Sequence, residues 1–473
     1  MKKVLCGILK AVVFFALVLA VLMPVSRLVE RKDSSKRFSP FLENAEDYDV
    51  LFFGDSRFMN GMMPLEIWKD YGIAGYNLAC YGNSMAATYW SMLNAFDYAK
   101  PKLVVIGVDG VVGMEKITGS SGDLHTAFDF YPLSKTKIRA FEDLMHDPEA
   151  PDARDDEGNL YRDIQWEYYF KLGKYHGRWN QLTMEDLIGR PEAKNGGELL
   201  VGIMPCEEYE IIEEDVYAEE TGHGFAYLRK AIQACQEREI DVLLVNLLSP
   251  LILGDQMAAN TVASIASEYG VDFVDITRLD SVADYAVDCY DGQPHFNVSG
   301  TMKVTDYLGS YLHRNFDLPD RRNQAGYDGW EKLHHAYLDE KVDLLRRQTE
   351  LDHVLLMLHD DDFDVSISVG RNTPLHEDDL GVLLMHNIAR EHVLVGEEYD
   401  KSSGGMYPLE MFDQAYFNSQ PYFFQRINGV VCESIGEEAQ QKAYHVFEMN
   451  NETGTMLKIS DRRTGEIIEQ FQF

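Results

Sequence analysis

The chain has 473 residues, of which 45% are hydrophobic and 12% aromatic, which is enough for ordinary globular cores in about two domains. Its 43 Lys and Arg residues stand against 78 Asp and Glu residues, which gives a net charge of −35. Such an acidic surface repels phosphate backbones and argues against a nucleic acid partner.

Residues 1–37 are predicted to form an uncleaved signal anchor. They carry eight basic side chains and an apolar stretch from residue 4 to residue 25, in which Lys10 can extend toward lipid headgroups. This stretch reaches the roughly 20 residues that a helix needs to cross a bilayer. A cleaved signal peptide is the competing interpretation, but no small-x-small cleavage site follows. The basic residues after the helix argue against export of the main domain. We nevertheless expect this domain to be extracytoplasmic, because the function inferred below requires that placement.

Residues 38–325 alternate short apolar runs with helical patterns. This alternation predicts a parallel sheet covered by helices on both faces. Predicted strands lie at 49–53, 76–79, 103–108, 241–246 and 271–276, and predicted helices at 84–100, 226–237, 257–269 and 299–315. The interval 111–224 interrupts the rhythm and is rich in aromatic and acidic residues. We interpret it as an insertion near the carboxyl edge of the sheet, where open α/β folds place their sites.

The last part of the chain has a different pattern. Residues 326–359 read as a helical connector, and residues 360–473 as a β-rich accessory domain. Apolar and polar residues alternate at 364–369, 428–432 and 444–449, and a hairpin is expected over 456–473. The acidic run after His359 lacks a calcium-loop spacing and is interpreted as a solvated turn rather than a cation site.

Two separate segments carry residues suited to nucleophilic catalysis. Ser56, in Gly-Asp-Ser, directly follows the first predicted strand, where a serine faces solvent at the end of a sheet. His295 precedes the last helix of the α/β region and can serve as the base that a serine hydroxyl needs. Asp291 is the nearest carboxylate that would orient this histidine, and Asp288 is the alternative. Alternatively, Gly-Asp-Ser is an ordinary turn and His295 an inert loop histidine. This alternative is disfavoured, because the serine follows the first strand and the histidine precedes the last helix of the same α/β region.

These motifs resemble the SGNH/GDSL hydrolase superfamily over roughly residues 46–110 and 226–315. The resemblance implies a flavodoxin-like three-layer sandwich with Ser56, His295 and Asp291 as catalytic residues. It also implies an oxyanion hole in which Gly82 stands at the family's second glycine, with Asn83 beside it. The chain departs from the family at Asp109, which replaces an oxyanion-hole asparagine, and in the longer spacing before the histidine. An ionised carboxylate at that position would repel the developing oxyanion.

The anchor, the insertion and the His-Phe-Asn-x-x-Gly ending are similar to one branch of this superfamily. That branch includes teichoic-acid D-alanyl transfer proteins and alginate-type O-acetyltransferases, which work with a multi-pass membrane acyltransferase. The resemblance implies acyl transfer on an envelope polysaccharide through an acyl-Ser56 intermediate. His125, Arg178 and Trp179 in the insertion are possible substrate-binding residues, although a packed insertion core is the alternative. A binding or docking role is expected for the C-terminal domain.

We therefore predict a membrane-anchored serine acyltransferase or acylesterase. The alternative is a catalytically weak scaffold or polysaccharide-binding accessory protein, which Asp109 favours. No nucleotide cofactor is expected, since no nucleotide-binding glycine motif follows a strand. No metal is expected either, since no cluster of metal-ligating residues is evident in the sequence. The five cysteines beyond the anchor have no tight spacing and predict neither a disulfide framework nor a zinc site.

Overall fold

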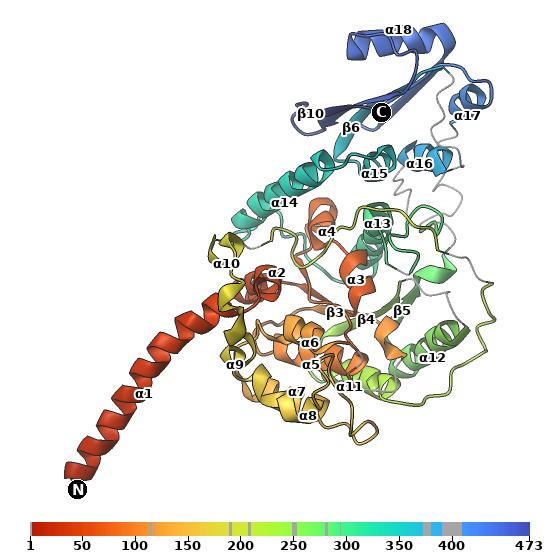
Figure 1. The fold of residues 1–473 in the computed structure, drawn as a ribbon. Helices are drawn as coiled ribbons and strands as arrows, with labels where there is room; N and C mark the ends of the chain where they lie inside the picture. The colour runs from red at the N-terminus through yellow and green to blue at the C-terminus, as the bar shows by residue number, and fades with distance from the viewer. Residues whose placement is uncertain are drawn as a thin grey trace.

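The computed structural model describes residues 2–112, 116–117, 119–188, 192–206, 210–247, 253–279, 282–293, 295–371, 380–389 and 409–473. It consists of an N-terminal helix, a mixed α/β domain built on a parallel sheet, and a C-terminal module built on a separate antiparallel sheet (Figure 1).

The first helix, α1 (Lys2–Val29), extends away from the rest of the molecule (Figure 1). Its segment Gly7–Val29 has a mean hydropathy of 2.7 and is long and apolar enough to cross a membrane. Both a membrane anchor and a signal sequence have these properties, and membrane anchoring stays a prediction.

The second helix, α2 (Lys32–Glu43), crosses the predicted boundary between anchor and domain at residue 37. Phe38 and Phe41 are fully buried in the core of the α/β domain. The buried Arg37 guanidinium donates to the carbonyl oxygens of Ala79 and Gly196, each at 2.8 Å. The helix α2 therefore packs as part of the domain on both sides of residue 37.

A five-stranded parallel sheet forms the centre of the α/β domain, with the strand order β2-β1-β3-β4-β5. This is one of the two common doubly wound orders. In register, Phe52 pairs with Asn77 on one side and with Val105 on the other. The strands are β1 (Val50–Phe53), β2 (Gly75–Asn77), β3 (Leu103–Gly107), β4 (Asp241–Asn246) and β5 (Asp272–Asp275).

Both faces of this sheet are covered by helices. Leu51 and Phe53 point into one apolar core, and Val50 and Phe52 into the other, as the two-residue period of a strand requires. The first core is closed by α5 (Met85–Ala95), α11 (Gly224–Gln236) and α12 (Leu253–Tyr269), and the second by α3 (Ser56–Gly61), α4 (Pro64–Tyr71) and α13 (Val298–Asn315).

The predicted insertion forms short helices that extend the layer around α5. The helix at residues 135–144 packs on α5, and the helix at residues 121–128 packs on α2 and α5. These elements follow the turn η2 (Asp109–Val111) and are α6 (Ser121–Phe128), α7 (Lys135–Leu144), α8 (Tyr161–Ile164), η3 (Gln165–Tyr168), α9 (Lys171–Tyr175), η4 (His176–Asn180) and α10 (Met184–Ile188).

Residues 192–206 form an irregular strap that returns from the insertion across the α/β domain. Asn195 accepts a hydrogen bond from the Asn77 N–H (2.9 Å), and the Glu198 N–H donates to Met59 in α3 (3.2 Å). Farther along, the Val298 N–H donates to Leu200 (2.8 Å). The strap therefore contacts both α3 and the start of α13.

The C-terminal module, predicted to be β-rich, contains a separate antiparallel sheet together with helices. Its antiparallel sheet has the order β10-β9-β6-β7-β8. Residues 444–447, predicted as part of a strand, end a helix because Ala439, Ala443 and Phe447 recur at four-residue spacing and pack against the sheet. The elements are β6 (Phe363–Val369), α16 (Leu380–Ala389), α17 (Glu410–Phe417), β7 (Tyr422–Ile427), β8 (Val430–Ile435), α18 (Gly436–Phe447), β9 (Thr455–Asp461) and β10 (Ile467–Gln472).

Two helices join the domains, α14 (Asp328–Arg346) and α15 (Leu351–Met357). They are packed elements, since Tyr337 and Leu345 of α14 are fully buried. The turn that follows was predicted to be solvated, but its first two residues are buried. His359 is 1% exposed and Asp360 is 4% exposed, because both lie against neighbouring elements.

Candidate active site

The turn between β1 and α3 places Ser56 at the first position of α3. Asp55 caps this helix, because its carboxylate accepts a hydrogen bond from the Arg57 N–H at 2.9 Å. Gly54 is required by close packing: a Cβ there would lie 2.8 Å from the Phe58 Cβ and 3.3 Å from the Gly107 Cα. The turn therefore runs tightly against the end of β3 and leaves the Ser56 side chain partly exposed.

The loop before α13 presents His295. Cys289 and Phe296 form an antiparallel bridge, and the Tyr290 N–H donates to the His295 carbonyl at 2.9 Å. Asn297 closes the base of the loop: its side-chain oxygen caps α13 and its amide donates to carbonyl oxygens that include that of Val287, at 2.7 Å. Asn297 and Phe296 are fully buried, so the loop has a fixed base below an accessible tip.

The structure brings Ser56, His295 and Asp291 together in a chain of hydrogen bonds. The Ser56 Oγ lies 2.8 Å from the His295 Nε2, and the His295 Nδ1 lies 2.9 Å from the Asp291 Oδ2. A carboxylate only accepts, so Nδ1 carries the proton and Nε2 is free to accept from the serine hydroxyl. The His295 and Asp291 side chains are 22% and 34% exposed, which leaves the site open to a substrate.

Asp291, rather than the alternative Asp288, contacts the histidine. Asp288 is fully buried and binds the Lys303 ammonium at 2.7 and 2.9 Å. The additional residue between Asp291 and His295 is accommodated, since the second Asp291 oxygen accepts a hydrogen bond from the Gln293 N–H at 3.0 Å. The longer spacing therefore does not prevent the pairing.

The turns after β1 and β2 meet at Gly54. Its carbonyl accepts from the Cys80 N–H at 3.1 Å and from the Asn83 side-chain amide at 3.4 Å. Asn83 thus lies beside the turn that carries Ser56. Gly82 adopts a left-handed conformation with φ of 61°, and a Cβ there would lie 2.8 Å from an Asp123 carboxylate oxygen. Both predicted oxyanion-hole residues belong to one tight turn at the carboxyl edge of the sheet.

Asp109 is paired with a cation that immediately follows Ser56. Its Oδ1 lies 3.2 Å from the Arg57 guanidinium, and its side chain is 1% exposed. Burial raises the pKa of the Asp109 carboxyl to about 7, against the lowering effect of the Arg57 charge. The Asp109–Arg57 pair therefore has a net charge of zero or +1. The contact with Arg57 reduces the repulsion of an oxyanion that an ionised Asp109 would cause, although Arg57 also lies 3.9 Å from the Asp55 carboxylate.

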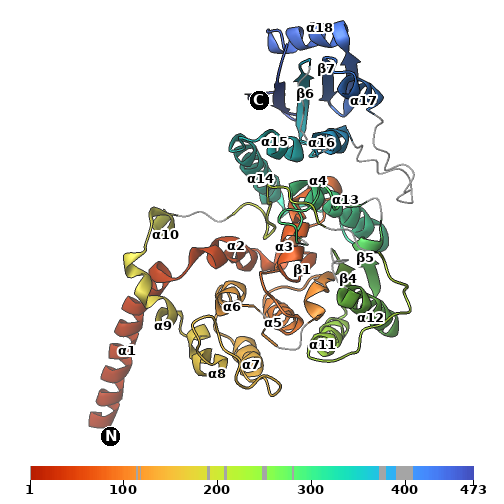
Figure 2. The ribbon, with the colours of Figure 1, turned by 45° about the vertical axis from the view of Figure 1, so that its right-hand side comes forward.

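The three insertion residues predicted to bind substrate lie elsewhere. His125 is 1% exposed, stacks on Tyr168 with ring centroids 4.0 Å apart, and contacts the Asp129 carboxylate at 3.1 Å. It is therefore part of the insertion core. Arg178 donates to the Val29 carbonyl at the end of α1 (2.8 Å), and Trp179 next to it is 72% exposed. In two views, α2 lies between this end of α1 and α3 (Figures 1 and 2).

Sequence reasoning did not identify Arg57 and Asn297 as parts of the site. The pattern Asn-x-Ser-Gly before a helix is typical of an N-cap and indicates the role of Asn297. Arg57 had no such signal, because its partner lies 52 residues later and meets it only through the β1–β3 pairing.

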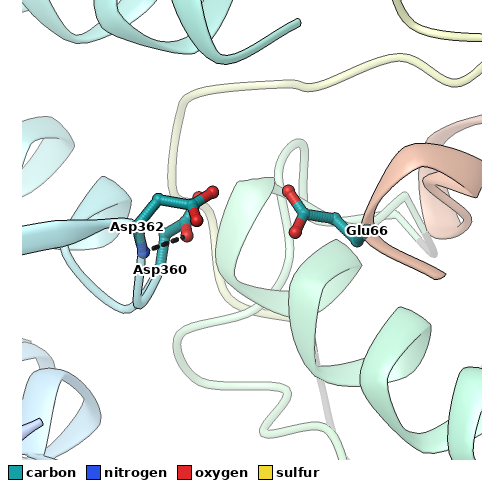
Figure 3. Close-up of side chains that lie close together, drawn as sticks. All are labelled: Glu66, Asp360 and Asp362. Carbon is teal, nitrogen blue, oxygen red and sulfur yellow. Dashed lines mark hydrogen bonds between the residues drawn. The ribbon is translucent and has the colours of Figure 1, made fainter. Parts of the chain in front are cut away.

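One group of three carboxylates among the described residues is close enough to share a cation. The ligand oxygens of Glu66, Asp360 and Asp362 lie within 4.8 Å of one another and face each other from two elements (Figure 3). However, the Lys341 ammonium contacts all three, at 2.7 Å from Glu66 and 2.6 Å from Asp362. The lysine supplies the positive charge at this position, and the group is best described as a buried ion cluster.

Comparisons with known proteins give little further information. No family model matches the chain, and no curated protein matches it. Among solved structures, a crystal structure from Bacteroides fragilis described as "a putative acylhydrolase" aligns with 60% of this chain and 100% of its own, at 12% identity and a TM-score of 0.29.

Proposed function

We propose that this chain is a serine-dependent acyltransferase or acylesterase of the SGNH/GDSL type. The observation that carries this proposal is the chain of hydrogen bonds from Ser56 through His295 to Asp291, at 2.8 and 2.9 Å. Its placement at the carboxyl edge of a doubly wound sheet supports the proposal, since ligands bind at this edge in open α/β folds.

The reaction begins when the Ser56 hydroxyl attacks the carbonyl carbon of an ester, while His295 Nε2 takes the hydroxyl proton. Asp291 holds the opposite nitrogen and stabilises the imidazolium that forms. We assign stabilisation of the oxyanion to hydrogen bonds from the Ser56 and Gly82 N–H groups and from the Asn83 side chain, with the Arg57 charge nearby. Collapse of the intermediate releases the alcohol, which takes the proton from His295, and leaves an acyl-Ser56 ester.

In the second half, His295 removes a proton from an acceptor hydroxyl, which attacks the acyl-Ser56 carbonyl. The acyl group moves to the acceptor and Ser56 regains its proton. We assign the acceptor or donor to an envelope polysaccharide, with a multi-pass membrane acyltransferase as a partner, on the basis of the motif resemblance. The extracytoplasmic placement of the domain belongs to the same proposal.

The test is acylation of the full-length chain, purified in detergent, with p-nitrophenyl acetate. Wild type should gain the mass of one acetyl group on the peptide that contains Ser56 and should release p-nitrophenol over many turnovers. Ser56→Ala should gain none, and His295→Ala should lose roughly 100-fold or more of the rate, as expected when a general base is removed.

Ser264→Ala provides the matched control, because Ser264 is an exposed serine on α12, away from the histidine loop. It should behave as wild type. Equal, slow release by wild type, Ser56→Ala and His295→Ala, all correctly folded, would contradict the enzyme proposal and favour the polysaccharide-binding scaffold. Adding glycan acceptors to active wild type then separates transfer from hydrolysis.

A further inference from the structure

The end of α1 is held by three neighbouring elements of the insertion. The helix contacts α9, η4 and α10. The Lys171 ammonium of α9 lies 2.5 Å from the Glu30 carboxylate just after α1, and Arg178 of η4 donates to the Val29 carbonyl at 2.8 Å. Arg178 also binds Asp186 of α10 at 3.1 Å. These contacts fix the insertion to the point at which the apolar helix ends.

Large apolar side chains are exposed on the same segment. Trp179 is 72% exposed, Met184 66%, Leu187 60% and Phe170 49%. Single exposed apolar residues are ordinary on a protein surface. Four of them between residues 170 and 187, on the segment that holds the end of α1, require a cause. We call these four residues the collar.

We propose that the collar lies in the headgroup region of the membrane that α1 crosses, with phospholipid as its occupant. This inference rests on the proposed membrane anchoring of α1. A 28-residue helix is about 42 Å long and exceeds the roughly 30 Å hydrocarbon core. Its last turns therefore pass through the headgroup region, and the collar is attached at those turns.

The chemistry of the collar fits this location. Tryptophan concentrates at membrane–water interfaces, where one side of its ring is apolar and its N–H finds a polar partner. Lys171 and Arg178 have apolar stems that lie along such a boundary while their charges bind Glu30 and Asp186. Contact with both helix and lipid would hold the domain against the membrane in one orientation, with α3, the helix that begins at Ser56, on the far side of α2 (Figure 2).

The experiment uses tryptophan fluorescence of the full-length chain in nanodiscs. Discs of phosphatidylcholine are compared with discs of phosphatidylcholine brominated near the headgroup end of its acyl chains, since bromine quenches tryptophan on contact. The chain has five tryptophans, so the difference between wild type and Trp179→Phe isolates Trp179. Brominated discs should reduce this difference signal at least about two-fold, as expected for an interfacial tryptophan.

Trp90→Phe is the matched control, because Trp90 lies on α5 and its indole N–H donates to Asp143 at 2.7 Å. Its difference signal should be equal in both discs. A Trp179 signal that bromine leaves unchanged, in a chain that enters the discs, would overturn the collar while α1 still anchors. A chain that stays outside the discs would overturn the anchor itself. Quenching of the Trp179 signal by soluble glycan alone would assign this side chain to sugar binding instead.

Discussion

At the scale of single residues, the Asp109–Arg57 pair determines the electrostatics beside Ser56. Arg57 is largely buried, and although burial lowers the pKa of its guanidinium, the charge of Asp109 raises it above the usual value. The arginine therefore stays charged, and the charge of the pair changes only when Asp109 ionises. A buried carboxyl whose pKa is raised to about 7 makes this change near neutral pH.

Asp109→Asn should change the pH dependence of activity in a defined direction. Below about pH 6, Asp109 is protonated, and both variants place a neutral side chain beside the Arg57 cation. Above about pH 8, the wild-type carboxylate adds a negative charge beside Arg57, whereas with asparagine only Asp55, at 3.9 Å, offsets the arginine charge that faces an oxyanion. The ratio of the Asp109→Asn rate to the wild-type rate should therefore rise about 3- to 10-fold between pH 6 and pH 8.

The measurement is p-nitrophenyl acetate turnover by wild type and Asp109→Asn over this range, expressed as the ratio of the two rates at each pH. Asp241→Asn serves as a control, since Asp241 is exposed at the start of β4, the end of the strand opposite the site. A ratio independent of pH would show that the ionisation of Asp109 does not affect the reaction.

The residue scale also shows what sequence can predict about a site. Ser56 and His295 were identified because each stands next to a predicted element boundary, after a strand and before a helix. Asp291 was separable from Asp288 only by proximity in sequence, and the structure separates them by burial and by the Lys303 contact. The Arg57–Asp109 contact depends on strand order, which no local pattern specifies.

At the scale of elements, the strap and the histidine loop are joined side by side. The Met204 N–H donates to the Cys289 carbonyl (3.1 Å), and the Gly292 N–H donates to the Met204 carbonyl (3.1 Å). Cys206 ends the described part of the strap, and its thiol donates to the Gln293 carbonyl at 3.0 Å. The Cys206 and Cys289 thiols are hydrogen bonded to each other: this contact lowers the pKa of Cys206 and raises that of Cys289.

This pairing predicts that oxidation joins Cys206 to Cys289. Both thiols are buried, so the oxidant must be small: hydrogen peroxide converts the more acidic Cys206 thiol to a sulfenic acid and releases water, and the Cys289 thiol then displaces a second water to form the protein disulfide. Two protein thiols lose two protons and two electrons, and the peroxide becomes two molecules of water. The cross-link should stabilise the folded chain by about 3–5 kcal/mol through loop closure. It would also restrain the loop two residues before Asp291.

Alkylation in denaturant followed by peptide mass spectrometry checks this prediction. The peptides containing Cys206 and Cys289 should appear cross-linked after oxidation and separate in Cys206→Ser. Cys235→Ser is the control: the Cys235 thiol contacts the Met92 sulfur at 3.6 Å and takes no part in the pair, so its replacement should not affect the cross-link. Full alkylation of both cysteines after oxidation would contradict the prediction. The spacing of the cysteines gave no indication of this pair, since 82 other residues separate them in the chain.

Element types were predictable where one pattern dominates. The predicted strand 241–246 coincides with β4. Five of its six residues are buried, and a short continuous apolar run is typical of a parallel strand covered on both faces. By contrast, α2 was missed because its sequence is polar on one side and contains Pro40. The strand predicted at 444–449 failed because a short alternation fits a helix equally well. Tertiary packing against the sheet decides between the two.

At the scale of the whole molecule, a buried ion cluster joins the two domains. Glu66 and Lys69 come from α4, Lys341 from α14, and Asp360 and Asp362 from the turn before β6. Burial raises the pKa of Asp360 to about 7, whereas the lysine charges hold those of Glu66 and Asp362 below their usual values despite burial. The charges of Lys69 and Lys341 are thus shared among these carboxyl groups and Asp361, which lies 3.1 Å from the Lys69 ammonium.

Lys341→Ala should therefore destabilise the molecule strongly. Its ammonium is 1% exposed and contacts three carboxyl groups, so its removal leaves buried negative charge with only Lys69 to compensate it. Removing one partner of a buried ion pair typically costs about 3–5 kcal/mol. Lys332→Ala makes the same substitution at an exposed position of the same helix and should cost less than about 0.5 kcal/mol.

Thermal and urea unfolding, followed by circular dichroism, compares the two variants with wild type. Because the cluster lies between domains, Lys341→Ala should also make the C-terminal module unfold before the α/β domain, as a separate transition. The Lys332→Ala chain should keep the wild-type transition. If both variants unfold as wild type does, the cluster does not couple the domains. The contact of Asn387 in α16 with Ser299 at the start of α13, at 2.9 Å, would then be a further polar link between the module and the helix that follows the histidine loop.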